Sequence, residues 1–331
     1  MNLHPALDVI TVGEAMVLFA AQAPGRLEDV PAFTRSTAGA ELNVAIGLAR
    51  LGLRVGYLSR VGQDSFGRHL LGVLKRENID HRHVAVDAGQ PTGFMLKSRS
   101  DDGSDPQIEY FRRGSAASRM HASELQPDYC ASARHLHLTG IFAGVSPSTR
   151  ELVFDLAARA RQAGQSISFD PNLRPALWPS QAVMIDCMNR LAALSDWVLP
   201  GLEEGRLLTG QHSPQGIAGF YLARGAQGVV IKLGAEGAYY ATATERGQVP
   251  GVKAARVVDT VGAGDGFAAG VVSGLLEGLS PAAATARGNV IGARVVQFPG
   301  DCDGLPTRAE LEAFVTDSGP ASSPAAPAAR A

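Results

Sequence analysis

The most informative segment of the chain reads Val257-Val258-Asp259-Thr260-Val261-Gly262-Ala263-Gly264-Asp265-Gly266-Phe267-Ala268-Ala269-Gly270. It begins like a strand, continues through a glycine-rich turn, and ends in a pattern typical of a helix. Phe267, Val271 and Leu275 lie four residues apart, which is the spacing of one helix face. The sequence therefore predicts a buried helix that begins at about Asp265.

The turn before this helix predicts an anion-binding site. The small residues Gly262, Ala263 and Gly264 let backbone N–H groups point at one spot, and a helix N-terminus adds partial positive charge there. An Asp at such a place is commonly only a helix cap. Beside a phosphate-sized anion site, however, a carboxylate can take the proton of an attacking hydroxyl while the amides stabilise a transferring phosphoryl group. The whole pattern therefore favours Asp265 as a catalytic base.

Length, charge and cysteine content restrict the class of protein. The chain has 331 residues, enough for a sizeable core. Its 30 Lys and Arg nearly balance 32 Asp and Glu, and no basic run could follow a phosphate backbone, so we expect no nucleic-acid partner. Three widely spaced cysteines favour a reducing cytoplasm over disulfides. No signal peptide or membrane-spanning run is recognisable, so we expect a cytoplasmic protein with no membrane partner.

The rest of the chain predicts an α/β fold with a mainly parallel central sheet flanked by helices. Short β-branched runs alternate with longer segments of helical period. Two segments, at about 14–37 and 92–120, interrupt this rhythm with extra strands, which we expect to form a small β-sheet lid over the carboxyl edge of the main sheet. Residues 318–331 are rich in Pro, Ala and Ser, so we expect a folded domain over residues 1–317 followed by a disordered tail.

The glycine-rich segment resembles the C-terminal signature of the ribokinase, or PfkB, family of carbohydrate kinases. Other motifs similar to that family occur in the right order: Gly13-Glu14, Ala38-Gly39-Ala40-Glu41-Leu42-Asn43, Val61-Gly62-Gln63-Asp64-Ser65-Phe66-Gly67 and Gly300-Asp301. The resemblance implies a ribokinase-like fold, ATP and Mg²⁺, Asp265 as base, and Gly262, Ala263 and Gly264 as anion-hole amides. No lysine directly follows a glycine, so a Walker A loop is absent and the nucleotide must be held differently.

The resemblance also implies a nucleotide site. Lys232, Gly234 and Gly237 belong to a segment that is similar to the family's nucleotide-binding strand and turn, although a plain β-turn would also explain the two glycines. Asn289 corresponds to positions near the adenine in similar kinases, but alone it would be an ordinary helix residue.

The motif that assists Mg²⁺ in many members of the family is incomplete here. It reads Asn-x-x-Glu after a strand, whereas this chain has Gly201 in place of the Asn and keeps Glu204. We therefore expect Mg²⁺ to enter on the ATP phosphates, with Glu204 acting through water. The resemblance is also compatible with a monovalent cation and with a homodimer formed through the lid.

Two departures from the fructokinase pattern indicate a sugar acid as substrate. Fructokinase-like and ribokinase-like members carry an acidic residue shortly after Gly13-Glu14, where this chain has Leu18. Fructokinases also commonly have Pro at the position of Glu41. Both features resemble the 2-keto-3-deoxygluconate kinase branch of the family, which implies phosphorylation of that keto-sugar acid to its 6-phosphate.

Two arginines fit the same substrate. Guanidinium groups bind carboxylates bidentately, so Arg112 on the lid and Arg174 after a strand end suit an acid better than a neutral sugar. Tyr110 shares a strand face with Arg112, because side chains alternate along a strand, and could reach the same ligand. The resemblance adds three further substrate contacts: Gly39, Asn43 and Asp301.

Other interpretations remain open from the sequence. Surface arginines are usually solvated, and the segment around Arg174 also occurs in fructokinases. The run Gly300-Asp301-Cys302-Asp303-Gly304 is also good turn composition. The alternatives are therefore a fructokinase or other ketose kinase and, from another class, a non-catalytic sugar-binding regulator.

Overall fold

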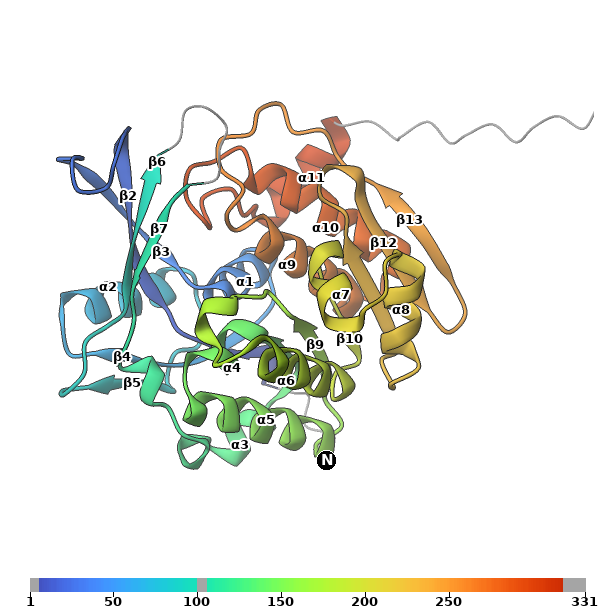
Figure 1. The fold of residues 1–331 in the computed structure, drawn as a ribbon, viewed down its shortest axis with the longest axis horizontal. Helices are drawn as coiled ribbons and strands as arrows, with labels where there is room; N and C mark the ends of the chain where they lie inside the picture. The colour runs from blue at the N-terminus through green and yellow to red at the C-terminus, as the bar shows by residue number, and fades with distance from the viewer. Residues whose placement is uncertain (1–5, 100–105, 318–331) are drawn as a thin grey trace, which may run out of the picture.

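The structure is a computed structural model that describes residues 6–99 and 106–317. The tail expected over residues 318–331 lies outside the described residues. Within them, alternating strands and helices form one large sheet with helices on both faces and a second, smaller sheet at one side (Figure 1). This arrangement confirms the predicted α/β class.

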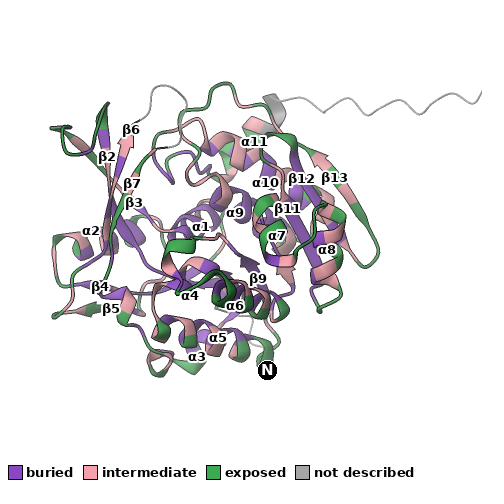
Figure 2. Ribbon diagram, viewed as in Figure 1, coloured by how far each residue is buried: buried purple, intermediate pink, exposed green. Residues whose placement is uncertain are grey.

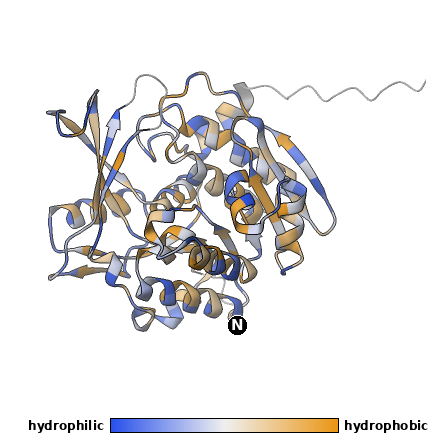
Figure 3. Cartoon of the chain, in the orientation of Figure 1, coloured by the Kyte–Doolittle hydropathy of each residue, from blue (hydrophilic) through white to orange (hydrophobic). Residues whose placement is uncertain are grey.

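The large sheet is parallel except at one edge. Seven neighbouring strands from β11 to β5 run in the same direction, and β12 and β13 continue the sheet antiparallel. Figure 3 shows the interior strands as mainly hydrophobic, as expected for strands buried on both faces. In spatial order the strands are β13 (Arg246–Pro250), β12 (Gly237–Thr242), β11 (Gly228–Lys232), β10 (Trp197–Val198), β9 (Ser166–Asp170), β8 (Ala133–Thr139), β1 (Leu7–Val12), β4 (Val55–Gly62) and β5 (Val84–Asp87).

Alternation along each strand divides the core into two layers. In β1, Val9 packs into one layer and its neighbour Ile10 into the other. Figure 2 shows the sheet buried between the two groups of helices. The first group is α1 (Ala40–Arg50), α2 (Ser65–Arg76), α9 (Ala263–Leu276), α10 (Pro281–Val295) and α11 (Arg308–Asp317). The second is α3 (Pro127–Cys130), α4 (Gly140–Val145), α5 (Pro147–Gln162), α6 (Gln181–Ala193), α7 (Leu202–Thr209) and α8 (Pro214–Leu222).

The segments that were expected to add strands form a separate four-stranded sheet, called the lid sheet below. Its order is β3 (Phe33–Ala38), β2 (Met16–Pro24), β6 (Phe94–Arg99) and β7 (Ile108–Phe111). β2 pairs antiparallel with β3 and parallel with β6, and β6 pairs antiparallel with β7. The lid sheet follows directly from β1 and leads directly into α1, so it stands beside the carboxyl edge of the large sheet (Figure 1).

Close packing of α9 against α10 fixes the helix that carries the predicted site. α9 begins at Ala263, two residues earlier than expected from the hydrophobic spacing. A Cβ atom on Gly270 would lie 2.7 Å from the Cα of Gly288 on α10, so a side chain has no room there. Among the described residues, no helix combines the length and apolar character needed to cross a bilayer.

Substitution of Gly270 by Ala should test this packing. The added methyl group meets backbone atoms that cannot move aside, so we expect Gly270→Ala to lower the free energy of unfolding by about 1–3 kcal/mol. Gly219 in α8 is the matched control, because a Cβ there meets nothing within 4 Å. Gly219→Ala should be neutral or stabilising by up to about 1 kcal/mol. Equal effects of the two substitutions in chemical denaturation would contradict the packing argument.

Candidate active site

A cavity of about 410 Å³ lies between the lid sheet and the carboxyl edge of the large sheet. This is the edge at which ligands of open α/β sheets usually bind. The cavity walls come from the loop after β1, α1, the lid sheet, the loop after β9 and the start of α9. Nine residues singled out in the sequence line it: Gly39, Asn43, Tyr110, Arg112, Arg174, Gly262, Gly264, Asp265 and Asp301.

Asp265 lies in the first turn of α9 and is only 7% exposed. Asn43 Nδ2 donates to its Oδ2 at 2.8 Å, and Asn172 Nδ2 donates to its Oδ1 at 3.3 Å. Burial raises the pKa of Asp265 to about 7; the Asn43 hydrogen bond opposes this shift, and Asp170 adds to it. A carboxyl group with this pKa is about half ionised at pH 7, and its ionised form is a stronger proton acceptor than an ordinary Asp.

Local geometry explains how Asn172 reaches this carboxylate. The chain leaves β9 at Asp170, whose Oδ1 accepts a hydrogen bond from the backbone N–H of Asn172 at 3.2 Å. Asn172 adopts a left-handed conformation with φ of 40°, which Asn tolerates better than most residues. This contact was not predicted, although the Asp-Pro-Asn run after a strand is a detectable signal for such a turn.

The start of α9 has the geometry expected of an anion hole. Gly262 precedes the helix with φ of 83°, and a Cβ there would lie 2.2 Å from the carbonyl oxygen of Asp301, so only glycine fits. The first N–H groups of a helix have no intrahelical acceptor. Gly262 and Gly264 line the cavity, whereas Ala263 is not among its lining residues.

Lys232, expected to contact nucleotide, is partly buried and forms an ion pair with the buried Asp170 close to the start of α9. Its Nζ lies 2.7 Å from Asp170 Oδ2, and 3.8 Å from the position that a Cβ on Gly264 would occupy. Burial lowers the pKa of Lys232, but Asp170 and Glu204 outweigh this and raise it, so the ammonium group stays charged. A fixed positive charge therefore lies close to the first turn of α9.

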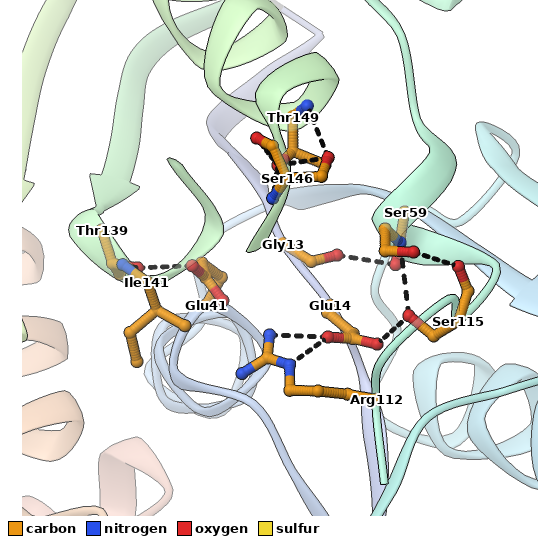
Figure 4. Close-up of polar contacts among 11 residues, drawn as sticks. Gly13, Glu14, Glu41, Ser59, Arg112, Ser115, Thr139, Ile141, Ser146 and Thr149 are labelled. Atoms are coloured by element: carbon orange, nitrogen blue, oxygen red, sulfur yellow. Dashed lines mark hydrogen bonds and ion pairs between the residues drawn. The ribbon is translucent and has the colours of Figure 1, made fainter. Parts of the chain in front are cut away.

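Arg112 is held by a carboxylate that the sequence analysis did not select. It follows β7 and donates to Glu14 Oε2 through Nε at 2.7 Å, and its Nη2 lies 2.6 Å from the same oxygen. Ser115 Oγ donates to the other oxygen of Glu14, which is 1% exposed (Figure 4). Tyr110, by contrast, is 45% exposed, and its ring centre lies 6.0 Å from the guanidinium carbon of Arg112. The pairing leaves Arg112 with only part of its donor capacity for a ligand.

Glu41 lies on the opposite side of this cluster, in the first turn of α1. Thr139 Oγ1, at the end of β8, donates to Glu41 Oε1 (Figure 4). Burial raises the pKa of Glu41, and the Thr139 hydrogen bond opposes the shift. Glu41, one of the two positions at which the sequence departs from the fructokinase pattern, lines the cavity itself.

The remaining predicted sugar contacts differ in how many of their polar groups already have a partner in the protein. Arg174 is exposed and donates through Nη1 to the carbonyl of Leu173 at 2.9 Å. Asp301 is buried and its Oδ1 lies 3.1 Å from Lys97 Nζ. Gly39 caps α1 with φ of 132°, and a Cβ there would lie 2.5 Å from the carbonyl oxygen of Glu14. Arg174 is thus the cavity arginine with the most available donors.

The other residues assigned to nucleotide lie outside this cavity. Gly234, with φ of 61°, begins a single 3₁₀ turn (Gly234–Glu236) after β11, and Gly237, with φ of 101°, follows that turn. Asn289 Nδ2 donates to the carbonyls of Val249 at 3.2 Å and Pro250 at 3.0 Å, so it ties α10 to the end of β13. The structure therefore shows a supporting contact for Asn289, and its role toward adenine stays a prediction.

Glu204 has structural contacts of its own. Its two oxygens accept from the backbone N–H groups of Gly201 and Leu173, each at 2.7 Å. It also raises the pKa of Asp170, after burial as the larger cause, which places the two carboxyl groups near each other. Oxygen donors of this kind fit Mg²⁺ that is bound through water, although no cluster of three potential metal ligands occurs among the described residues.

Comparison with known proteins gives matches over most of the chain. The profile of the pfkB family carbohydrate kinases matches residues 6–308. The chain is 51% identical over 311 residues to 2-dehydro-3-deoxygluconokinase from Bacillus subtilis (strain 168), which covers 94% of this chain and 96% of that protein.

Two solved structures extend the comparison. A PfkB protein from Polaromonas sp. JS666 is 54% identical with a TM-score of 0.87, and the match covers 93% of this chain and 100% of that chain. A chain from E. coli, solved in complex with ATP and Mg²⁺, is 26% identical with a TM-score of 0.86, covering 94% and 99%. The family resemblance and the ribokinase-like fold are thereby confirmed, and the protein is a sugar kinase: the chain belongs to the pfkB family of carbohydrate kinases.

Proposed function

We propose that this kinase transfers the γ-phosphoryl group of ATP to the 6-hydroxyl of 2-keto-3-deoxygluconate. The observation that carries the proposal is Asp265, a buried carboxyl with a pKa of about 7, in the first turn of α9 and at a cavity with two arginines. The name and 51% identity of the Bacillus subtilis relative support the same sugar acid.

Asp265 would act as the general base. With Oδ1 and Oδ2 held by Asn172 and Asn43, its carboxylate is oriented toward the cavity that would hold the sugar. It accepts the proton of the 6-hydroxyl as the oxygen attacks the terminal phosphorus atom. The bond from that phosphorus to the bridging oxygen breaks, and ADP leaves.

Charge on the transferring phosphoryl group would be stabilised by the first-turn amides of α9, with Gly262 and Gly264 at the cavity wall. The ammonium group of Lys232 lies close behind them. Mg²⁺ would supply charge neutralisation on the ATP phosphates, and Asp170 and Glu204 would hold its water ligands.

The sugar acid would be positioned mainly from the other side of the cavity. Arg174 has the free donors needed to bind a carboxylate, whereas Glu14 already engages Arg112 through Nε and Nη2, so Arg112 can add only its remaining N–H groups. Asp301 and Tyr110 remain candidates for the sugar hydroxyls. Of the two arginines expected to suit the acid, Arg174 would therefore be the main partner of its carboxylate.

A kinase for fructose or another ketose is the alternative from the same family. Leu18, the position at which such kinases carry an acidic residue, is fully buried in the lid sheet with Met16 and Met95. The lid sheet therefore offers no carboxylate at this position for the hydroxyl groups of a neutral sugar. A monovalent cation, a homodimer through the lid and a cytoplasmic location stay predictions.

Removal of the base tests the mechanism. Asp265→Asn keeps the shape of the side chain but cannot accept the proton, so turnover should fall about 10²- to 10⁴-fold. Circular dichroism and the melting temperature should show an intact fold, because a buried carboxyl is replaced by a neutral amide. Near-normal turnover of this variant would show that another group is the base.

The pKa of Asp265 predicts a pH dependence. The base is active when ionised, and its pKa is raised to about 7, so kcat/KM should fall about tenfold per pH unit below pH 7 and level off above it. Asn43 lowers this pKa by hydrogen bonding to the ionised form. Asn43→Ala should therefore move the midpoint of the profile upward. A profile that stays flat down to pH 5 would contradict the assignment.

Arg174 tests the substrate class. Arg174→Met should raise the KM for 2-keto-3-deoxygluconate about tenfold or more, because a carboxylate loses a charged partner, and should barely change the KM for ATP. Arg113 is the control, since it is exposed and lies beside Arg112 but does not line the cavity. If Arg113→Met and Arg174→Met behave alike, Arg174 does not bind the acid group.

A further inference from the structure

Lys97 is a buried cation of the lid sheet that has no part in the reaction proposed above. Side chains alternate along β6, so Met95 and Lys97 point to one side, whereas Phe94 stacks on Phe111 at the other. Met95 lines the cavity, so the side of β6 that carries Lys97 faces the active site. The Lys97 side chain is 3% exposed. Lysines are almost never buried so deeply unless they are paired.

The partners of Lys97 are two carboxylates on separate segments of the kinase core. Its Nζ contacts Asp259 Oδ2 and lies 3.1 Å from Asp301 Oδ1. Asp259 belongs to the loop that leads into α9, and its Oδ1 accepts from the N–H of Val261 at 3.0 Å. Asp301 belongs to the loop that follows α10. One ammonium group from the lid sheet therefore joins both loops that border the anion hole.

The two loops also contact each other directly. Gly262 lies so close to Asp301 that a Cβ on it would be 2.2 Å from the Asp301 carbonyl oxygen. Both residues line the cavity. A displacement of the Asp301 segment would therefore disturb the residue that immediately precedes α9.

Charge gives a second connection between Lys97 and the catalytic base. Burial raises the pKa of Asp301, and Lys97 is the strongest influence that opposes this shift. Asp301 is in turn one of the carboxylates that raise the pKa of Asp265, after burial as the largest cause. The ammonium group thus favours the ionised form of Asp301 and offsets negative charge close to Asp265.

We propose that Lys97 is a positioning residue that couples the lid sheet to the catalytic loop. With the lid sheet over the cavity, its ammonium group fixes the Asp301 carboxylate for the sugar. The same group holds the loop at 259–262 in the arrangement that lets the first turn of α9 receive the phosphoryl group. The inference rests on the proposed kinase reaction and adds to it a residue that acts through Asp301 and Asp259.

Lys97→Met tests this role, because it keeps the length of the side chain and removes the charge. We expect the KM for the sugar acid to rise about tenfold or more, with a smaller change in the KM for ATP. Amide hydrogen exchange over residues 259–264 should become faster. Lys97→Arg should recover most of the wild-type KM. Arg35→Met, which removes an exposed cation from β3 of the same sheet, should leave both measurements unchanged.

A second variant covers the case in which Lys97→Met does not fold, since two buried carboxylates would then lack a cation. Lys97→Met combined with Asp259→Asn removes one of those charges, yet it still leaves Asp301 without its partner, so the raised KM should persist. A folded variant of either kind with wild-type KM and wild-type exchange would overturn the inference. Absence of sugar-dependent ADP release from the wild-type protein would instead reject the proposed function.

Discussion

The proposed reaction depends on one constraint: the carboxyl group of Asp265 is kept out of water at the start of a helix. Burial raises its pKa, the hydrogen bond from Asn43 opposes this shift, and the side chains of Asn43 and Asn172 hold its two oxygens. Those amides come from α1 and from the loop after β9, so the large sheet and its first helix must both be in place before the base is oriented. Close packing of α9 on α10 fixes the helix that carries Asp265.

Charged side chains around the cavity form ion pairs that are buried or partly buried. Among the described residues, Glu14 pairs with Arg112, Asp170 with Lys232, and Asp301 with Lys97. Each pair joins segments that are distant in the sequence, and breaking one partner would leave a buried charge without compensation. Arg174 is the cavity cation that has no carboxylate partner among these residues, which suits a ligand that brings its own carboxylate.

The sequence predicted the fold class, the two inserted segments and the residues around Asp265, because these depend on local spacing, turn chemistry and a long motif. It did not predict that Glu14 and Lys97 would lie beside Arg112 and Asp301, since ion pairs across about 98 and 204 residues leave no periodic signal. The supporting contacts of Asn289 and Glu204 were missed for a similar reason. Both side chains bind backbone groups, and every residue type except Pro offers the same backbone N–H and C=O groups, so the sequence does not show which of them is the partner.

The central claim is that this cavity phosphorylates a sugar acid. The most direct measurement is ADP release from ATP and Mg²⁺ with 2-keto-3-deoxygluconate, fructose and ribose side by side, with the Asp265→Asn protein as the blank. The account predicts the highest kcat/KM with 2-keto-3-deoxygluconate. A clear preference for fructose or ribose would contradict the substrate assignment, and no sugar-dependent ADP release with any of the three would contradict the proposed reaction.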